Sequence, residues 1–509
     1  MVLGVLFLIV GEIIMNTSKD KLSRYMDAGF PILMYNTYDE PNAVNILASL
    51  DDSRTVIQWS EIGMVVNESD ANDITLDSML QFLVATGGED LNSSIVILKD
   101  IRHYISNPKV IGLLKYIAQL ITTDGVEECT LVLLGENIEL PVELEPFVTI
   151  IDEDAVKPNE IALCIERFCN EQDIPVDNML KGKLINAFRG LSKYEIENIL
   201  ALSYADDGEI TSNDLELVLE QKKQIVKKSG VLEMIALDET MNDIGGLEVL
   251  KEWIQNKAKI YKDIDAAKAF GVDMPKGVLI AGIPGCGKSL SAKATAKLFN
   301  TPLLRLDMGR IMGKYVGESE QNMRKAIKIA EDISPCVLWI DEIEKAFSGV
   351  SGGSSTGDIT NRLLGSFLTW LQEKKSQVFV IMTANDVNKL PAELIRKGRL
   401  DEVFFVEFPN NKEREQIFKI HLEKRRPTDL ANINLDKIVS KTDGYSGADI
   451  EGVVKDAIEL AFTSERNVVT TEDIIKSIDN THSLKVIMSK SIDDMIKMYK
   501  EKKFKNASK

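Results

Sequence analysis

A glycine-rich octapeptide, GIPGCGKS at residues 282–289, has the residue types and spacing of a phosphate-binding loop. Gly282, Gly287, Lys288 and Ser289 satisfy the pattern GxxxxGK[ST], directly after the apolar run GVLIA and before a helical pattern. The glycines let the backbone curl so that its N–H groups and the start of the next helix face phosphate oxygens, while Lys288 supplies a cation for the β- and γ-phosphates. We expect Ser289 to place its hydroxyl on Mg²⁺.

Two acids end a second apolar run, CVLWIDE at residues 336–342. We expect Asp341 to hold Mg²⁺ through water and Glu342 to polarise the water that attacks the γ-phosphate. A third run, VFVIMTA, leads to Asn385, which would orient the same water, although an Asn at a strand end is also a common turn former. Two carboxylates at one phosphate site indicate hydrolysis, because binding alone would not need the second.

Arg396 and Arg399 lie in the following segment, IRKGRLDEV, and the sequence identifies no acidic partner for them. A planar guanidinium stabilises the charge that develops on a γ-phosphoryl group during its transfer. A guanidinium supplied by a neighbouring subunit would make hydrolysis depend on assembly. The alternative is that both arginines form surface salt bridges.

Short apolar runs alternate with helical patterns from about residue 276 onward, which predicts a parallel sheet covered by helices on both faces, the three-layer α/β class. After Pro409 the amphipathic patterns predict an all-helical lid. The predicted strands are GVLIAG, TPLLRLDM, CVLWIDEI, VFVIMTAN and VFFVEF.

The first half of the chain repeats this plan. LPVEL at 140–144 matches LPAEL at 390–394, and GLSKYEIENIL at 190–200 matches GYSGADIEGVV at 444–454. The nearly constant offset predicts a duplicated domain, with chance similarity of short segments as the alternative. Its predicted strands are FPILMYN, SIVILKDI and TLVLLGEN, at 30–36, 94–101 and 130–137.

This first copy lacks the chemistry of the second. MYNTYDEPNAV, without glycine or lysine, stands where the phosphate loop should be, and EPFV replaces the arginines. We align Asp100 with Asp341, which puts Ile101 where Glu342 stands in the second copy. We therefore expect neither tight nucleotide binding nor hydrolysis here, and a role as scaffold, substrate adaptor or second tier of a ring.

The combined motifs resemble those of the AAA+ ATPases, in particular the classical AAA clade, over roughly residues 238–480. GIPGCGKS looks like Walker A, WIDE like Walker B, TAND like sensor 1, and RKGRLDE like the arginine-finger segment, with Lys397 where the family usually has Pro. NDIGG is similar to the segment that contacts adenine, and YSGADI to the lid segment that covers base and ribose. The nucleotide contacts that the resemblance implies are Ile244, Gly245, Gly282, Pro284, Gly285, Cys286, Gly287, Lys288, Ser289, Leu290, Gly447 and Ala448.

Within that family, GKYVGESE at 313–320 resembles the first pore loop of a ring. The resemblance implies that Tyr315 and Val316 grip an extended peptide, whereas an exposed or core tyrosine is the alternative. The layout of a degenerate first half and an intact module is similar to AAA+ proteins encoded in algal chloroplast and cyanobacterial genomes, with bacterial relatives. No HExxH follows the module, so a fused zinc protease is excluded.

Composition bounds the partners and the compartment. The 509 residues carry a net charge of −19, which disfavours nucleic acid. Five cysteines without a CxxC pair and three scattered histidines form no local zinc pattern, so we expect free thiols in the cytoplasm, or in the plastid stroma of an organelle. The apolar stretch MVLGVLFLIV is too short to span a bilayer and lacks a basic n-region. We interpret it as a mis-called start before Met15, with an apolar packing segment or membrane association as alternatives.

The predicted division has six parts. The lysine-rich QKKQIVKKSG at 221–230 is interpreted as a linker helix, and the basic end MIKMYKEKKFKNASK as a disordered, solvated tail, with a contact to an acidic partner as the alternative. The parts are an N-terminal extension (1–20), a degenerate AAA+-like α/β domain (21–165), a helical lid-like subdomain and linker (166–235), a catalytic AAA+ α/β domain (236–410), a helical lid (411–485) and a basic tail (486–509).

The leading hypothesis is a Mg²⁺-ATP hydrolase that forms a homo-oligomeric ring, with six subunits expected, and remodels or unfolds protein substrates by pulling peptide through its pore. The first alternative is a regulatory switch in which ATP-dependent assembly changes what the N-terminal half binds. A nucleic-acid motor is the third, which acidity and the lack of a DNA-binding motif disfavour.

Overall fold

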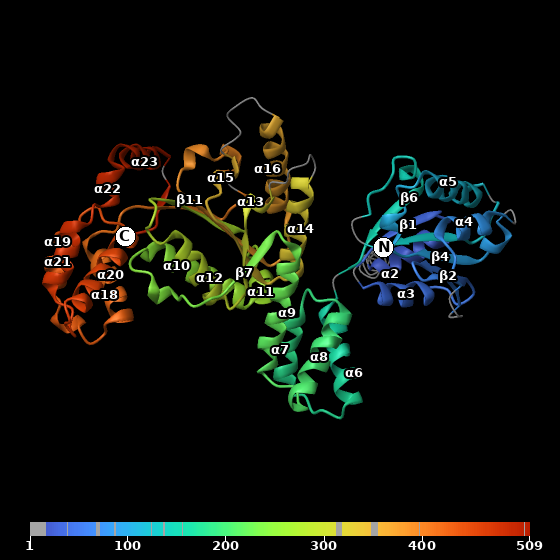
Figure 1. Ribbon diagram of the computed structural model, residues 1–509, viewed down its shortest axis with the longest axis horizontal. Coiled ribbons are helices and arrows are strands. Elements are labelled where there is room, and N and C mark those ends of the chain that lie inside the picture. The colour runs from blue at the N-terminus through green and yellow to red at the C-terminus, as the bar shows by residue number, and fades with distance from the viewer. Residues whose placement is uncertain are drawn as a thin grey trace. The chain divides into compact units, whose positions relative to one another are not determined.

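The computed structural model describes residues 17–37, 39–67, 72–85, 88–123, 125–135, 138–154, 156–311, 318–347, 355–396, 398–502 and 504–509. The chain forms two compact units, one ending at Leu217 and the other beginning at Val218 (Figure 1). Among the described residues, no helix has the length and apolar character needed to cross a membrane. The N-terminal extension before residue 17 and the predicted pore-loop residues Tyr315 and Val316 lie outside the described residues.

The C-terminal unit is built on a seven-stranded sheet of order β13-β12-β8-β11-β10-β9-β7. The five strands predicted from apolar runs are confirmed, and they pair in parallel. Two edge strands were not predicted: β7 (Leu232–Ile235), antiparallel to β9, and β13 (Lys505–Asn506), parallel to β12. The five predicted strands are β8 (Gly277–Gly282), β9 (Leu303–Leu306), β10 (Cys336–Ile340), β11 (Val378–Ala384) and β12 (Glu402–Val406).

Both faces of this sheet are buried, because successive strand residues enter two different cores. Leu279 and Leu338 pack with α14 (Glu318–Asp332) and α16 (Ser355–Glu373) on one face. Val278 and Trp339 pack on the other face, with α10 (Glu248–Lys262) and α12 (Lys288–Phe299). The alternation explains why these strands are apolar throughout, and the three-layer α/β class is confirmed.

A helical lid follows, with its own core of Phe418, Val453 and Ile474. Its second long helix begins at a capping box, in which the Ser446 hydroxyl accepts from the Asp449 amide. The lid helices are α18 (Asn411–Arg425), α19 (Leu435–Ser440), α20 (Gly447–Thr463) and α21 (Thr471–Asn480).

The N-terminal unit repeats the architecture, as predicted. Its six-stranded sheet has the order β3-β2-β4-β5-β1-β6, in which β6, β1, β5, β4 and β2 take the places of β12, β8, β11, β10 and β9. The two sheets differ at both edges. The edge strand β3 is the return arm of a hairpin with β2, and in the described residues β13 has no counterpart in the first sheet. The strands are β1 (Ile32–Asn36), β2 (Thr55–Ser60), β3 (Gly63–Val66), β4 (Ser94–Leu98), β5 (Thr130–Leu134) and β6 (Val148–Asp152).

Helices complete this copy. The matching segments noted in the sequence fall at equivalent places, because Ser192 caps α8 as Ser446 caps α20. The helices are α2 (Ser18–Asp27), α3 (Glu40–Ala48), α4 (Leu76–Ala85), α5 (Pro108–Thr122), α6 (Pro158–Glu171), α7 (Asn178–Phe188) and α8 (Lys193–Asp207). The next helix, α9 (Asp214–Ser229), crosses the boundary between the units, and its Val226 lies in a core of the C-terminal unit.

One predicted alignment between the copies is wrong by one residue. Counted from the ends of β4 and β10, Lys99 corresponds to Asp341 and Asp100 to Glu342. The backbone agrees, since Asp100 and Glu342 are both left-handed, with φ of 54° and 48°. The first copy therefore lacks the acid expected to hold the metal rather than the one expected to polarise water.

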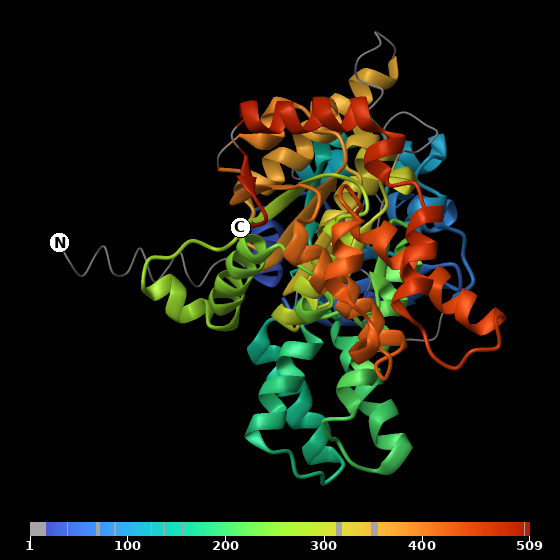
Figure 2. The same cartoon turned by 90° about the vertical axis from the view of Figure 1, so that its left-hand side faces the viewer.

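The expectation of a disordered basic tail is also wrong. The tail forms α22 (Leu484–Ile487), α23 (Ser489–Lys502) and β13, and Figure 2 shows β13 as a short red arrow next to the C-terminus. Ala507 is fully buried, and its carbonyl accepts from the amides of Val249 and Leu250 at the start of α10. The many lysines concealed an apolar spacing, with Ile492, Ile496 and Tyr499 in contact with the two cores.

Tyr499 fastens this tail, because its ring stacks on Phe405 of β12 with centroids 3.6 Å apart and its side chain is 2% exposed. We expect Tyr499→Ala to lower the free energy of unfolding of the C-terminal unit by about 3 kcal/mol, through lost burial and a cavity. Urea unfolding followed by tryptophan fluorescence measures this, since Trp253, Trp339 and Trp370 lie in this unit. The exposed Tyr116 provides the control, and an equal midpoint for Tyr499→Ala and Tyr116→Ala would contradict the packed tail.

Candidate nucleotide site

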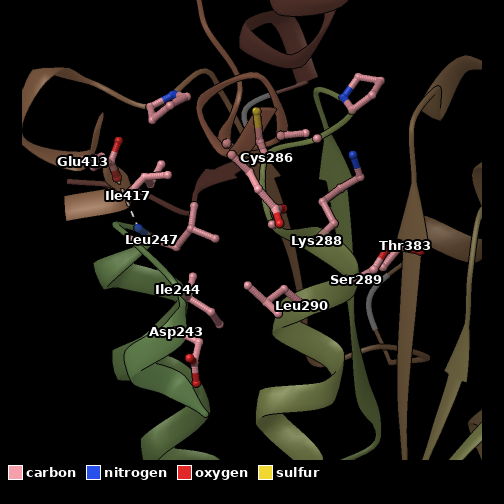
Figure 3. Close-up of a pocket in the computed structure, with 18 of the residues that line it drawn as sticks. Asp243, Ile244, Leu247, Cys286, Lys288, Ser289, Leu290, Thr383, Glu413 and Ile417 are labelled. Carbon is pink, nitrogen blue, oxygen red and sulfur yellow. Dashed lines mark hydrogen bonds between the residues drawn. The ribbon is translucent and has the colours of Figure 1, made fainter. Parts of the chain in front are cut away.

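A cavity of about 420 Å³ lies where the carboxyl ends of the catalytic sheet meet the lid (Figure 3). Most of the predicted nucleotide contacts line it, together with Asp341, Glu342 and Asn385. Gly282 is the predicted contact that does not, because it ends β8 behind the loop. The predicted contacts in the lining are Ile244, Gly245, Pro284, Gly285, Cys286, Gly287, Lys288, Ser289, Leu290, Gly447 and Ala448.

Backbone geometry explains the glycines of the phosphate loop. Gly282 has φ of 146°, and a Cβ there would lie 2.2 Å from the carbonyl oxygen of Val406, so no side chain fits between β8 and β12. Gly285 and Gly287 have φ of 73° and 85°, which turns the loop into the start of α12. The helix N-terminus thus opens into the cavity, as phosphate binding requires.

Lys288 is 7% exposed and has no carboxylate bonded to it among the described residues. Its ammonium donates to the carbonyl oxygens of Gly282 and Ile283, at 2.9 and 2.8 Å. Burial lowers the pKa of Lys288 from 10.5 to about 8, although nearby acids including Asp341 oppose the shift. The loop therefore holds a cation whose charge a phosphate would stabilise.

Asp341 and Ser289 meet across the cavity floor. The Ser289 hydroxyl donates to Asp341 Oδ1 at 3.4 Å, and the Thr383 hydroxyl donates to the same oxygen at 2.5 Å. No group of three or more His, Cys, Asp or Glu side chains that could hold a metal occurs among the described residues. The oxygen pair fits Mg²⁺, which usually takes one or two protein oxygens and completes its shell with water and substrate phosphates.

Glu342 is held in place by three neighbours. Its backbone is left-handed, its amide donates to the Thr383 hydroxyl at 3.2 Å, and its carboxylate pairs with Lys345. Asn385 Nδ2 donates to Glu342 Oε1 at 3.0 Å, so the structure brings these two predicted residues together.

Glu344 holds the backbone of Asn385 in place. Its carboxylate accepts from the Asn385 amide at 3.0 Å, and burial raises its pKa. Thr383 was not predicted, although a hydroxyl two residues before Asn385 was visible in the sequence. Its hydroxyl donates to the Asp341 carboxylate and accepts from the Glu342 amide, so it positions both acids.

The lid closes the opposite end of the cavity. A Cβ on Gly245 would lie 2.5 Å from Ile417 of α18, and the Leu247 amide donates to Glu413 Oε1 at 3.1 Å. The Ala448 amide donates to the Gly285 carbonyl at 3.0 Å, which joins the lid to the phosphate loop. The lining residues from the lid and tail that sequence reasoning missed are Glu413, Ile417, Ile420, His421, Glu451 and Ser508.

The two arginines lie apart from this cavity. Arg396 is exposed, Arg399 donates to the Glu393 carbonyl, and neither belongs to the lining. Lys397 between them lies outside the described residues.

Comparison with known proteins agrees with this geometry. Residues 278–408 match the family "ATPase family associated with various cellular activities (AAA)", and residues 432–476 match the AAA+ lid domain. Residues 18–153 and 159–229 match the N-terminal and second domains of SpoVK-like AAA ATPases.

The chain is similar to whole proteins as well. It is 36% identical to the AAA domain-containing protein ycf46 of Guillardia theta over 95% of both chains, and 36% identical to that of Pyropia yezoensis over 90% of this chain and 93% of the relative. A proteasome-activating nucleotidase of Pyrococcus abyssi is 32% identical over 47% of this chain and 61% of its own.

The pKa of Lys288 predicts how nucleotide affinity depends on pH. Because bound phosphate favours the ammonium, ADP must bring a proton with it above pH 8, so affinity should fall by about tenfold per pH unit between pH 8 and 10.5 and stay level below pH 8. Calorimetric titration with ADP and EDTA from pH 7 to 9.5 measures this. Lys288→Arg is the control, since a guanidinium stays protonated and its profile should be flat. Equal slopes for both proteins would contradict the assignment.

Proposed function

The chain belongs to the AAA ATPases, and from that premise we propose that it hydrolyses Mg²⁺-ATP as a ring, with six subunits expected, and remodels protein substrates. One observation carries the proposal. A single cavity gathers the phosphate loop, two acids and Asn385, while Arg396 and Arg399 lie outside it on the same chain. Each subunit would thus hold all of a hydrolytic site except the arginines.

Within the cavity, we assign the phosphate contacts to the loop amides, the start of α12 and the Lys288 ammonium. Ile244 and Gly245 would contact the base, with Gly447 and Ala448 of the lid covering base and ribose. The presence of all four residues in the lining of one cavity supports this assignment.

For hydrolysis, Glu342 would accept a proton from the attacking water, and Asn385 would orient that water and the carboxylate. Their hydrogen bond of 3.0 Å supports this pairing. Mg²⁺, when bound, would neutralise charge on the phosphates, and Ser289 and Asp341 would hold it. Lys345, paired with Glu342, would have to release the carboxylate before it could serve as a base.

We assign Arg396 and Arg399 to the site of the neighbouring subunit. A guanidinium supplied across an interface stabilises the charge of the transition state and couples hydrolysis to assembly. The exposure of Arg396 and the absence of both arginines from the lining of their own cavity support this assignment.

The proposal of protein remodelling rests on the resemblance of the segment with Tyr315 and Val316 to a pore loop and on the likeness to a proteasome-activating nucleotidase. The cytoplasm, or the plastid stroma, is the proposed compartment, because all five cysteines are free and buried. We also retain the six-part division of the chain as a proposal.

A second candidate is a switch in which ATP-driven assembly changes what the N-terminal unit binds. The observation in its favour is that this unit preserves a complete sheet and core while lacking the phosphate loop. A nucleic-acid motor is disfavoured by the net charge of −19.

Mixing two inactive proteins tests whether the arginines act between subunits. We expect Glu342→Gln and the double variant Arg396→Ala/Arg399→Ala each to lose ATPase activity by about a hundredfold or more. In a mixture, Glu342→Gln subunits offer their arginines to sites with an intact Glu342. An equimolar mixture should regain up to about a quarter of the wild-type rate. A mixture no faster than its components would contradict the shared site.

Replacing Tyr315 distinguishes remodelling from switching. Glu342→Gln should bind ATP and stall with its client, so the proteins that co-purify with it identify the substrate. A remodeller with Tyr315→Ala should lose processing of that client while most ATPase activity survives, with Tyr116→Ala as the control. Unimpaired processing by Tyr315→Ala would favour the switch.

A further inference from the structure

The N-terminal unit contains a second cavity, of about 610 Å³, at the counterpart of the nucleotide site. Glu153 lines it directly after β6, as Glu407 lines the catalytic cavity directly after β12. The first lid-like helix α6 and the start of α8 form its walls, in the places of α18 and α20. The volume is within the range of small-molecule sites.

Tyr35, on strand β1 next to the edge strand β6, lines this cavity and is fully buried. Its hydroxyl has no hydrogen bond of ordinary geometry among the described residues, although the Ser18 side chain lies near it. A buried hydroxyl without a partner is costly, so a ligand that accepts its proton would relieve that cost.

The charges of the two cavities differ in sign. One lysine and six carboxylates line the catalytic cavity, whereas four basic and three acidic side chains line the second. A polyanion that binds in the catalytic cavity therefore needs a metal ion to offset the carboxylates. The second cavity has more basic than acidic groups, although the whole protein has a net charge of −19, so a polyanion could bind there without a metal ion.

The acids of the second cavity are already engaged by the protein. Asp154 accepts from the Ser18 amide at 2.5 Å, Glu160 accepts from the Lys157 amide at 2.8 Å, and Glu153 accepts from the Thr37 hydroxyl.

Two of the basic groups remain available. Arg167 pairs with Glu197, and Lys19 donates to Ser49 at 3.3 Å. Lys157 and Lys193 form no ion pair among the described residues, and they enter the cavity from separate elements. Two ammonium groups near the starts of α6 and α8 suit a phosphate group.

We propose that this cavity binds a small phosphorylated compound without a divalent cation, through Lys157, Lys193 and the Tyr35 hydroxyl. Triphosphate held by a glycine loop is not its ligand, because residues 30–37 contain no such loop. The site is independent of hydrolysis in the C-terminal unit, so its failure would leave the proposed function intact.

Equilibrium dialysis of the full chain with radiolabelled pyrophosphate tests the proposal, with EDTA present and the catalytic site saturated with ADP. We expect one pyrophosphate per chain, and at least about a tenfold loss of affinity for Lys157→Ala/Lys193→Ala. Lys115→Ala/Lys183→Ala removes the same charge from exposed positions outside the cavity and should bind as the wild type does. No retained pyrophosphate, or equal losses for the two pairs, would overturn the site.

Tyr35→Phe separates ligand binding from folding. Without ligand its thermal midpoint should equal or exceed that of the wild type, since the variant removes a buried donor that lacks a partner. Its affinity for pyrophosphate should fall several-fold. A variant that unfolds earlier, or that binds pyrophosphate as tightly as the wild type, would overturn the role of the hydroxyl.

Discussion

The curl of backbone between β8 and α12 is the constraint on which the catalytic half depends. Gly282 lies so close to the Val406 carbonyl that a methyl group would not fit, and this contact fixes where the loop leaves the sheet. From that point the positive φ angles of Gly285 and Gly287 direct the start of α12 into the cavity. The Lys288 ammonium donates to two carbonyl oxygens of its own loop. A bound phosphate would replace these two hydrogen bonds.

The two halves of the chain separate fold from chemistry. Both place the same five parallel strands in the same order, which strands that are apolar throughout and joined by helical crossovers are enough to specify. The chemistry resides in a few residues at the strand ends, and those residues differ. Asp100 has the same left-handed backbone conformation as Glu342, but its copy has no phosphate loop to place a γ-phosphate near it. The N-terminal unit thus lacks the loop that would bind a triphosphate but has a cavity at the carboxyl ends of its strands, where parallel α/β sheets usually bind ligands.

The sequence was sufficient for the parts of the molecule governed by local rules. The parallel strands followed from apolar runs and the phosphate loop from its spacing. It was insufficient where contacts join distant segments. Thr383 acts through Asp341, 42 residues away, and Glu413 reaches Leu247 across 166 residues. The tail was misread because its lysines outweigh its apolar residues in composition, whereas packing depends on the spacing of Ile492, Ile496 and Tyr499.

Electrostatics links these contacts to control of the ATPase. Six carboxylates and one lysine line the catalytic cavity, so charge repulsion disfavours binding of a triphosphate unless a cation binds with it. Lys345 neutralises Glu342 in the meantime, and Asn385 holds the same carboxylate from the other side. Under the proposed function, hydrolysis would require the metal and the nucleotide in this cavity and a guanidinium from a neighbouring subunit. The acidic lining and the ion pair between Lys345 and Glu342 would both have to be offset before water could be activated, and this is the physical reason for which the proposal assigns a metal and an outside arginine to the site.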